Sequence, residues 1–507
     1  MRSSPRDPED VGRSLAAIVR GRVLTGAARV ARFGRDGSHL FGRPSAVVAP
    51  KDREDVVALV GWARRRGVPL VPRGGGTSLD GESVPPDGGV VVDLSGWSRL
   101  LEVDTEGLWA RVEPGIVNYD LQRSLLPHGL FFPPNPGSWT TSTVGGNVGT
   151  NASGMRSFRY GPTRAWVREL TAVLGTGETV HLGTRAAKRS VGPDLLQLFI
   201  GSEGTLGVAS EVTVRLAPLP SVRHGVVVPL SPGVALGPLV ARLARLSDAG
   251  LSAVEFLDTG SADALSEQPG ADWPGGTPLL LLEVEAASAR EAARRIRQLG
   301  LALGAVGTRP AVTTFEDADE LWTLRGKSGD VLLARYGYHV REDVAVPLGR
   351  IDELVAELAG IALREKVPYF LFGHLGEGSL HPNYVVDPTG PVAERIRAAV
   401  LRAAHALGGT ISAEHGIGRL KRPYLTEELG GAAVALLWAV KRACDPDGIL
   451  NPGKLYPERP PRARSPSRSL SGSAAARVPT GSPTSVGRRR RPRPGPRPGP
   501  GTRGARR

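Results

Sequence analysis

The chain has 507 residues, of which 40% are hydrophobic and 22% charged, a composition typical of a globular protein with two or three domains. Residues 458–507 hold 14 Arg and one Glu and so carry +13 of the net charge of +14. The rest of the chain is nearly neutral, and its charge gives no argument for nucleic-acid binding.

The single cysteine, Cys444, excludes an internal disulfide framework and a cysteine-ligated cluster within this chain. We expect it to act as a small buried apolar residue. The N-terminus mixes acidic and basic residues without an apolar core, so it does not resemble a secretory signal. No apolar run approaches the ~18 residues needed to span a bilayer. These features favour a cytoplasmic protein, with peripheral membrane association left open.

The first part of the chain alternates helix and strand patterns. Apolar spacing predicts an amphipathic helix within residues 9–31. Residues 45–50 predict a strand, and residues 52–67 predict a helix that begins at an Asp N-cap and stops at a Gly. Residues 68–81 predict a strand and a glycine loop. This βαβ-like unit ends in glycines, where phosphate sites are common.

Further strands follow along the same region. Residues 88–96 and 108–115 predict strands, and residues 118–128 predict a helix. Residues 170–182 predict a hairpin that turns at its glycines, and residues 194–216 predict a glycine turn before a strand.

The pattern changes near residue 222. Three apolar strands and a helix at 288–300 predict an α+β domain with an antiparallel sheet. Residues 349–457 predict a mostly helical segment with two Gly/His-rich loops. The tail from residue 458 lacks periodicity and predicts disorder.

Two glycine-rich stretches are candidate ligand loops. Residues 133–154 are too rich in Gly and Pro for a helix or a long strand. Their N–H groups would suit a pyrophosphate or a polar ring system, and an ordinary turn region is an equal alternative. The second loop is RGGGTS at 73–78. Neither matches a Walker loop, and the Rossmann spacing occurs only at Gly499–Gly504 in the tail.

Three histidines fall in Gly-flanked loops. His374 and His381 would lie on opposite faces of a straight strand, whereas a turn at residues 376–378 would let them converge. With Glu414, which precedes His415, they form a two-His, one-carboxylate set that is common at catalytic metals. Surface or hydrogen-bonded histidines and a backbone-capping Glu are the alternative.

Two basic features have weaker signals. Arg325 follows an aromatic-containing helical turn and could hold a substrate carboxylate bidentately, although most arginines are simply solvated. The Arg-rich tail could bind nucleic acid or anionic lipid non-specifically. A solvated extension without function is the alternative, and we expect no specific nucleic-acid partner.

Six segments carry a family resemblance: PRGGGTSLDG, PPNPGSWTTSTVGGNVGTNASGMRSFRYG, FIGSEGTLGVASEVTVRLAPLP, FGHLGEGSLHPN, SAEHGIGRLKRPYL and CDPDGILNPGKLYP. In this order, over about residues 40–457, they resemble the FAD-binding oxidoreductases of the vanillyl-alcohol oxidase (PCMH-type) superfamily. The last three resemble its D-2-hydroxyacid dehydrogenase branch. That branch includes D-lactate dehydrogenases, the glycolate oxidase catalytic subunit and D-2-hydroxyglutarate dehydrogenase.

The resemblance implies an α+β fold in which a two-subdomain FAD-binding domain precedes an α+β substrate (cap) domain with an antiparallel sheet. The implied parts are an N-terminal helical segment (1–40), the PCMH-type domain (41–221), the cap domain with the metal loop (222–411), a C-terminal helical segment that returns to the flavin (412–457) and a disordered tail (458–507).

The resemblance also implies FAD between the two subdomains. The link is expected to be non-covalent, because Thr77 stands where covalent relatives place a histidine. The pyrophosphate would lie on the amides of the first loop, the flavin along the second, and the adenine near the 203–208 turn. The implied contacts are Arg73, Gly74, Gly75, Gly76, Thr77, Ser78, Pro134, Ser138, Thr143, Gly145, Gly146, Asn147, Thr150, Ser153, Gly154, Glu203, Gly207, Val208 and Asn451.

His374, His381 and Glu414 match the divalent-metal ligands of this branch, usually zinc or manganese. Arg325 matches its substrate-carboxylate arginine, and Arg341 stands, more loosely, where some relatives have a carboxylate-binding lysine. Asn383 and His415 are implied to line the same pocket.

The implied reaction is FAD-dependent oxidation of a D-2-hydroxy acid, of the D-lactate, glycolate or D-2-hydroxyglutarate class, to the 2-oxo acid. Metal coordination lowers the pKa of the hydroxyl, His415 accepts its proton, and hydride moves to flavin N5. Electrons then need an external acceptor: an iron–sulfur subunit, electron-transfer flavoprotein, cytochrome or quinone. An oxygen-using oxidase and a non-catalytic flavin-binding subunit are alternatives, and a homodimer stays open.

Overall fold

The structure, a computed structural model, describes residues 8–231, 233–246, 250–304, 313–337 and 339–458. The predicted disordered tail lies outside the described residues except for Glu458. Among the helices of the described ranges, none is long and apolar enough to cross a membrane.

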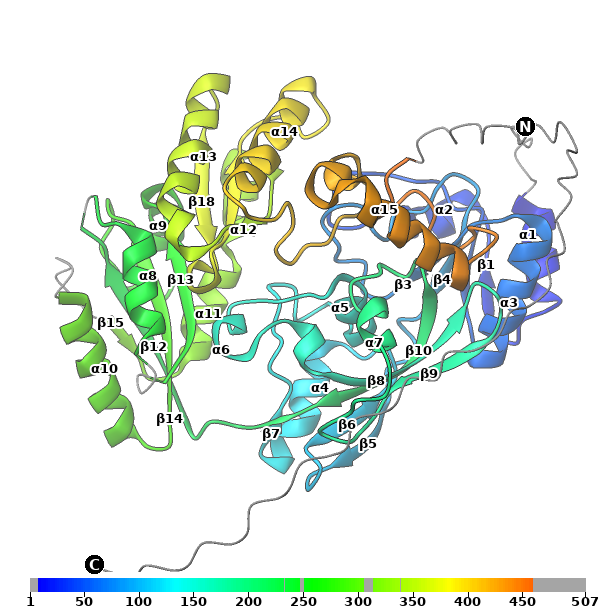
Figure 1. The fold of residues 1–507 in the computed structure, drawn as a ribbon, viewed down its shortest axis with the longest axis horizontal. Coiled ribbons are helices and arrows are strands. Elements are labelled where there is room, and N and C mark those ends of the chain that lie inside the picture. The colour runs from blue at the N-terminus through cyan, green and yellow to red at the C-terminus, as the bar shows by residue number, and fades with distance from the viewer. Residues whose placement is uncertain (1–7, 232, 247–249, 305–312, 338, 459–507) are drawn as a thin grey trace, which may run out of the picture. The chain divides into compact units, whose positions relative to one another are not determined.

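The first glycine loop follows a small, mainly parallel sheet with the order β1-β2-β4-β3 (Figure 1). Its strands are β1 (Arg22–Leu24), β2 (Ala46–Ala49), β3 (Leu70–Arg73) and β4 (Val90–Asp93). Helix α3 (Arg53–Arg66) connects β2 to β3. As predicted, Asp52 caps it by accepting the Asp55 N–H, and Gly67 ends it in the left-handed conformation. The loop that begins at residue 74 therefore leaves the carboxyl end of a parallel strand, where open sheets place ligands.

The predicted helix over residues 9–31 is wrong in its extent. Helix α1 (Pro8–Ala16) buries Val11 and Leu15, but the chain then forms β1, antiparallel to β2, before α2 (Ala27–Val30) and η1 (Ala31–Gly34). A Cβ at Gly21 would lie 2.1 Å from the carbonyl oxygen of Ala49. This close backbone approach, which apolar spacing does not reveal, commits the segment to strand pairing.

A five-stranded antiparallel sheet with the order β5-β6-β10-β8-β9 completes the first half of the molecule. Its strands are β5 (Leu100–Asp104), β6 (Trp109–Val112), β8 (Val167–Leu174), β9 (Thr179–Gly183) and β10 (Gly207–Arg215). The flanking elements are α4 (Asn118–Leu125), η2 (Leu126–His128), β7 (Leu130–Phe131), α6 (Ser157–Tyr160), η3 (Thr163–Ala165), α7 (Leu195–Phe199) and β11 (Ala217–Pro218). The predicted hairpin over residues 170–182 is confirmed as β8–β9. Val173 and Val208 pack into the core of the first sheet and join the two sheets.

The second glycine-rich stretch contains a helix, which contradicts the expectation that residues 133–154 form none. Helix α5 (Val144–Thr150) starts at Thr143, whose side chain accepts the Gly146 N–H, and ends at Asn151 in the left-handed conformation. Val144 and Val148, four residues apart, are both buried. Capping and tertiary packing therefore outweigh the low helix propensity of its glycines.

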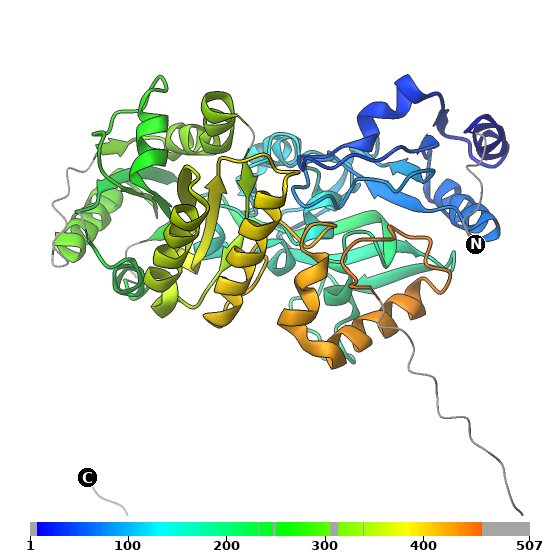
Figure 2. The ribbon, with the colours of Figure 1, turned by 90° about the horizontal axis from the view of Figure 1, so that it is seen from above.

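The second half is built on a larger sheet, as the predicted strands and antiparallel pairing indicated (Figures 1 and 2). Its main order is β15-β12-β14-β13-β18-β19-β16, and β17 pairs with β19. The strands are β12 (Val222–Pro229), β13 (Leu251–Leu257), β14 (Leu279–Ala286), β15 (Thr313–Phe315), β16 (Val340–Arg341), β17 (Val344–Ala345), β18 (Tyr369–Gly373) and β19 (Ser379–Tyr384).

Helices cover both faces of this sheet. Along β12, Val226 and Val228 belong to one core cluster and Val227 to another, so alternate side chains are buried on opposite faces. The covering helices are α8 (Leu236–Ala244), α9 (Thr259–Ser266), α10 (Ala289–Gly304), α11 (Ala318–Gly326), α12 (Ser328–Tyr336), α13 (Ile351–Glu365) and α14 (Pro391–Ala406). The segment from residue 349 is thus less purely helical than predicted, because β18 and β19 join the sheet.

The C-terminal segment returns to the first sheet. Helix α15 (Leu425–Cys444) contains a kink at Gly430, and the chain after it places Leu450 in a parallel bridge with Leu70 of β3. Lys441 is buried and donates to the carbonyl oxygens of Thr205 and Leu450 at 2.6 and 2.8 Å. These bonds tie the end of the described chain to the turn before β10. The domain boundaries given above stay predictions.

Candidate active site

A cavity of about 580 Å³ opens between the two glycine loops and the edge of the large sheet. It brings together residues from segments more than 300 positions apart in the chain, from Pro72 to His415. The expected cofactor residues that line it are Arg73, Gly74, Gly75, Gly76, Thr77, Ser78, Ser138, Thr143, Gly145, Gly146, Asn147, Thr150, Glu203 and Gly207. The expected catalytic and metal residues that line it are Arg325, Arg341, His374, His381, Glu414 and His415.

The two glycine loops pack closely against each other. A Cβ at Gly74 would lie 2.1 Å from Thr143 Oγ1, and one at Gly75 would lie 2.3 Å from the carbonyl oxygen of Thr141. Side chains there would force the loops apart, so glycine is required at both positions. Residues of both loops line the cavity, and the main-chain N–H groups of such glycine-rich loops suit a phosphate-containing cofactor.

The other expected cofactor residues lie outside the cavity lining: Pro134, Ser153, Gly154, Val208 and Asn451. Their surroundings explain the placement. Gly154 has φ +140° and packs against the backbone of Asn135, and Val208 is fully buried in β10. Asn451 donates to the carbonyl oxygens of Glu82 and Glu203 at 2.9 and 2.7 Å. Asn451 therefore braces the cavity wall from behind.

Glu203 and Glu82 form a buried acidic pair in the cavity wall. Glu203, with φ 54°, accepts the N–H groups of Ile417 and Gly418 at 2.7 and 3.1 Å. Burial raises its pKa to about 7, against the opposing effect of those two N–H groups and Lys454. Burial and the Glu203 carboxylate together raise the pKa of Glu82. Glu82 has no signal in the sequence that would mark it as part of the site.

The two predicted metal histidines converge across a β-hairpin. His374 follows β18, η6 (Leu375–Glu377) makes the turn, and His381 lies on β19. Their ring centroids are 4.9 Å apart, which confirms the predicted turn. Oε1 of Glu414 lies 2.9 Å from His374 Nε2 and 3.4 Å from His381 Nε2. Glu414 Oε2 is buried without a hydrogen-bond partner in the described residues. Two imidazoles and a carboxylate with a spare oxygen fit a divalent cation.

A buried carboxylate that sequence analysis missed supports His374. Glu255 of β13 is fully buried, and its Oε1 lies 2.6 Å from His374 Nδ1. Its Oε2 accepts a hydrogen bond from Nε of Arg325 at 3.0 Å and forms an ion pair with Nη2 at 2.8 Å. Arg325 also lies 4.5 Å from the ring centre of Phe372. The signal in the sequence is a single acid in the mostly apolar strand LSAVEFL, which does not reveal its partners.

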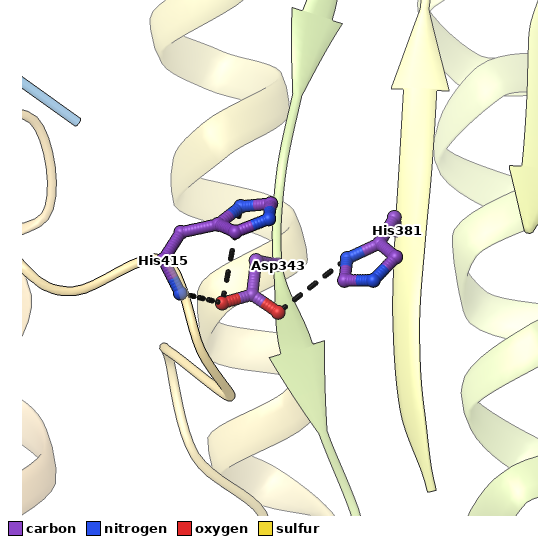
Figure 3. Close-up of side chains that lie close together, drawn as sticks. All are labelled: Asp343, His381 and His415. Atoms are coloured by element: carbon purple, nitrogen blue, oxygen red, sulfur yellow. Dashed lines mark hydrogen bonds and ion pairs between the residues drawn. The ribbon is translucent and has the colours of Figure 1, made fainter. Parts of the chain in front are cut away.

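Asp343, a second buried carboxylate, braces the other side of the site (Figure 3). Its Oδ2 accepts the backbone N–H groups of residues 413–415 at 3.0, 2.8 and 2.8 Å, and its Oδ1 lies 3.5 Å from His381 Nδ1. The His415 ring stacks on that of His381 at 5.1 Å. Burial disfavours the charged form, but His415, Lys421 and His381 hold the pKa of Asp343 below its usual range.

Asp343, His381 and His415 form a second group with metal-ligand donors. Lys421 Nζ, however, lies 3.8 Å from Asp343 Oδ2 and donates to the Asp343 carbonyl oxygen at 3.1 Å. An ammonium beside a carboxylate that already accepts three N–H groups disfavours a cation there. This group therefore supports the loop that carries Glu414 and His415.

Arg341 differs from Arg325 because no carboxylate of the described residues lies within 4 Å of it. Its Nη2 lies 3.4 Å from His339 Nε2, and His339 Nδ1 lies 3.2 Å from the carbonyl oxygen of Gly337. Burial and Arg341 lower the pKa of His339 to about 4, so this ring is neutral and accepts from the guanidinium. A Cβ at Gly329 would lie 2.7 Å from Arg341 Nη2. Asn383, outside the cavity lining, pairs with Arg341 between β19 and β16 and donates to the His381 carbonyl oxygen.

Two family matches cover most of the described chain. Residues 44–183 match the FAD binding domain, and residues 234–455 match the FAD linked oxidases C-terminal domain. Among curated relatives, the glycolate oxidase subunit GlcD of Bacillus subtilis is 34% identical, with 82% of this chain and 89% of the relative covered. The D-2-hydroxyglutarate dehydrogenase of Stutzerimonas stutzeri is 33% identical, with 89% and 99% covered. The mitochondrial cytochrome-linked D-lactate dehydrogenase of Arabidopsis thaliana is 34% identical, with 82% and 74% covered.

Solved structures agree on the fold. A substrate-bound p-cresol methylhydroxylase superposes with a TM-score of 0.76 at 16% identity, with 89% of this chain and 97% of that chain covered. The 4-ethylphenol oxidase of Gulosibacter chungangensis gives 0.72 at 18% identity, with 90% and 99% covered. The predicted α+β fold with a PCMH-type FAD-binding domain is confirmed. The chain therefore belongs to the FAD-linked oxidases, in which an FAD binding domain is joined to the FAD linked oxidases C-terminal domain, and it is an FAD-linked oxidoreductase.

Proposed function

We propose that this enzyme oxidises a D-2-hydroxy acid, of the D-lactate, glycolate or D-2-hydroxyglutarate class, to the 2-oxo acid. The observation that carries the proposal is the convergence of His374, His381 and Glu414 on the cavity that the two glycine loops also line. The relatives named above, glycolate oxidase, D-2-hydroxyglutarate dehydrogenase and D-lactate dehydrogenase, support the same class.

The glycine loops fit FAD held without a covalent bond. We assign the diphosphate to the amides of residues 74–78, the flavin to the face formed by Gly145, Gly146 and Asn147, and the adenine end to the turn at Glu203. The FAD, when bound, supplies the hydride acceptor. The chain itself contributes the polar backbone of the two loops and their close packing, since side chains at Gly74 and Gly75 would separate the loops.

The His/His/Glu group fits a divalent cation, zinc or manganese. Such a cation, when bound, supplies the positive charge that makes a substrate hydroxyl acidic enough to lose its proton near neutral pH. His415 is the proposed base for that proton, because its ring lines the cavity and lies beside Glu414, with Nε2 3.7 Å from Glu414 Oε1.

The substrate carboxylate is assigned to Arg325 and Arg341 of the cavity wall, and Arg341 is the more important of the two for binding it. Arg341 has no carboxylate of the described residues within 4 Å and can pair with the substrate directly. Arg325 already forms a buried ion pair with Glu255, to which its Nε donates a hydrogen bond. It therefore shapes the pocket and orients Glu255 more than it offers free charge.

The electrons need an acceptor outside this chain. Cys444 is the single cysteine, so a cysteine-ligated iron–sulfur cluster within the chain is excluded. A separate iron–sulfur subunit, an electron-transfer flavoprotein, a cytochrome or a quinone would serve.

Anaerobic mixing tests the proposal. The enzyme loaded with FAD and Zn²⁺ or Mn²⁺ is mixed with glycolate, D-lactate and D-2-hydroxyglutarate while the visible band of oxidised flavin is followed. We expect at least one acid to bleach the band and yield one 2-oxo acid per flavin. Failure of all three, with FAD and metal contents verified, would contradict the proposed reaction.

A further inference from the structure

Helix α6, which follows the second glycine-rich stretch, lies against the turn between His374 and His381 (Figure 1). That turn is η6. A Cβ at Gly376 of η6 would lie 2.5 Å from Cδ2 of Phe158 in α6. The Phe158 ring therefore packs directly on the turn, at a position where only glycine leaves room for it.

A hydrogen bond joins the same helix to the same turn. The Ser157 hydroxyl is buried and donates to two acceptors, the carbonyl oxygen of Gly154 and Oε2 of Glu377 in η6. The backbone N–H of Glu377 donates in turn to the His374 carbonyl oxygen at 3.1 Å. A continuous set of hydrogen bonds therefore leads from the second glycine-rich stretch to a candidate metal ligand.

The residues around this bond anchor α6 to the large sheet. Arg156 Nε donates to Oε1 of the fully buried Glu283 at 3.1 Å, and Tyr160 donates to Glu285 Oε2 at 2.7 Å. Met155 lines the cavity and is buried in a core cluster of the large sheet. Residues 155–160 are therefore part of the body that carries the metal residues, although they follow the cofactor loop directly in the chain.

The other end of this segment is continuous with helix α5. Gly146 and Asn147 of α5 line the cavity face that is assigned to the flavin. The Ala152 N–H donates to the Asn147 carbonyl oxygen at 2.9 Å, and the Ala152 carbonyl oxygen accepts the Thr163 N–H at 3.0 Å. Only a short, hydrogen-bonded stretch therefore separates the flavin face from α6.

We infer that residues 155–160 couple the two ligand sites, so that FAD and the divalent cation each raise the affinity for the other. Ser157 and Glu377 are positioning residues in this coupling. The inference rests on the FAD and cation sites of the proposed function. A bound cation fixes the separation of His374 and His381 and with it the turn between them, and the turn holds α6 and the flavin face. By linkage, the same factor applies in both directions.

Direct attraction between the FAD diphosphate and the cation is a separate contribution, because both ligands occupy one cavity. It does not pass through the bond between Ser157 and Glu377, so a change at that bond leaves it intact. Substitutions at the two ends of the bond therefore separate the contribution of α6 from direct electrostatics.

The test compares FAD affinity with and without the cation. The FAD-loaded protein is either saturated with Zn²⁺ or freed of metal with a chelator that is then removed. It is diluted at constant ionic strength, and released FAD is measured by its fluorescence. We expect the dissociation constant of FAD to be at least about fivefold higher in the metal-free protein, and this factor is the coupling ratio.

Two variants remove the bond from opposite sides. Ser157→Ala and Glu377→Ala should each lower the coupling ratio about threefold, as expected for loss of one hydrogen bond. The double variant should lower it no further than either single variant, because both changes remove the same contact. The ratio compares each variant with itself, so a change in FAD affinity alone does not alter it.

Matched controls should keep the wild-type ratio. Ser45→Ala removes a buried hydroxyl that donates to the Gly88 carbonyl oxygen, and Glu357→Ala removes an exposed acid of α13. Both positions lie outside the cavity lining.

The outcomes are distinct. A wild-type ratio near one, or a ratio that either Ser157→Ala or Glu377→Ala leaves unchanged, would overturn the inference. No substrate enters this measurement, so failure of every 2-hydroxy acid to reduce the flavin would overturn the proposed reaction and leave a measured coupling intact. Absence of any bound cation in the wild type would overturn both the proposed cation site and the coupling.

Discussion

Two buried carboxylates outside the glycine loops, those of Glu255 and Asp343, set the geometry of the candidate site. Glu255 holds His374 and Arg325 together, and Asp343 holds the backbone of residues 413–415 next to His381. The candidate ligands themselves were predictable from Gly-flanked histidines. Their supports were not, because a lone acid in a strand has no sequence signature that names its partner.

Glu255→Gln should weaken metal binding about tenfold, because the charge behind His374 is lost while the side-chain shape is kept. The measurement is competition for Zn²⁺ with a fluorescent chelator, on protein whose FAD content is unchanged. Glu285→Gln is the matched control: this buried acid of β14 bonds Tyr160 and lies outside the cavity lining. Equal metal affinity in the two variants would argue against the role of Glu255.

Asp343→Asn should lower flavin reduction by the substrate about ten- to a hundredfold and leave FAD bound. The amide lacks the negative charge that faces the three N–H groups and His381, so the loop that carries Glu414 and His415 loosens. Asp352→Asn serves as control, because Asp352 also accepts two backbone N–H groups, at residues 236 and 237 in the cap. The account would be wrong about this loop if both variants kept wild-type rates.

At the scale of elements, local signals predicted some features and tertiary contacts decided others. The Asp cap and Gly stop of α3 were visible in the sequence, as was the turn between His374 and His381. Helix α5 is not predicted because its glycines have low helix propensity. Its formation depends on the Thr143 cap and on packing against the core. The predicted extent of the N-terminal helix is too long because the approach of Gly21 to β2 is a long-range contact that the local pattern does not show.

Gly75→Ala tests the contact between the glycine loops. The added methyl would lie 2.3 Å from a backbone oxygen and must displace a loop, at a cost of about 1–3 kcal/mol. We expect FAD affinity to fall about tenfold or more, seen as a lower ratio of flavin to protein absorbance after dilution. Gly96→Ala is the control, because a Cβ there meets nothing within 4 Å. Equal flavin retention in both variants would contradict the packing argument.

At the scale of the whole molecule, the C-terminal segment packs against the cavity wall, where Glu203 and Glu82 are buried. Glu203 accepts N–H groups from residues 417 and 418. Lys454 and Lys421 act electrostatically on Glu203, which in turn acts on Glu82. The sequence motifs predicted that this segment returns to the cofactor domain. They did not predict that the contact between the two segments would bury the carboxylates of Glu203 and Glu82.

The buried carboxyl group of Glu203 makes the stability of the fold depend on pH. Glu203 has a pKa of about 7 in the folded protein and 4.5 as its ordinary value, so its raised pKa stabilises the fold below pH 4.5 and this contribution is lost as pH rises to 7. Glu203→Gln removes the titration. The thermal midpoint of the variant minus that of wild type should therefore increase from pH 4.5 to pH 7. Glu320→Gln, at an exposed position on α11, should show no such trend, and a flat difference for Glu203→Gln would contradict the assignment.

The most direct test of the central claim, that His374, His381 and Glu414 serve oxidation of the substrate rather than cofactor binding, is anaerobic flavin reduction by His381→Ala. Wild type should hold one divalent cation per chain, and a 2-hydroxy acid should reduce its flavin. The variant should keep its FAD, lose the cation and leave the flavin oxidised. Reduction at the wild-type rate, or loss of FAD from the variant, would contradict the account.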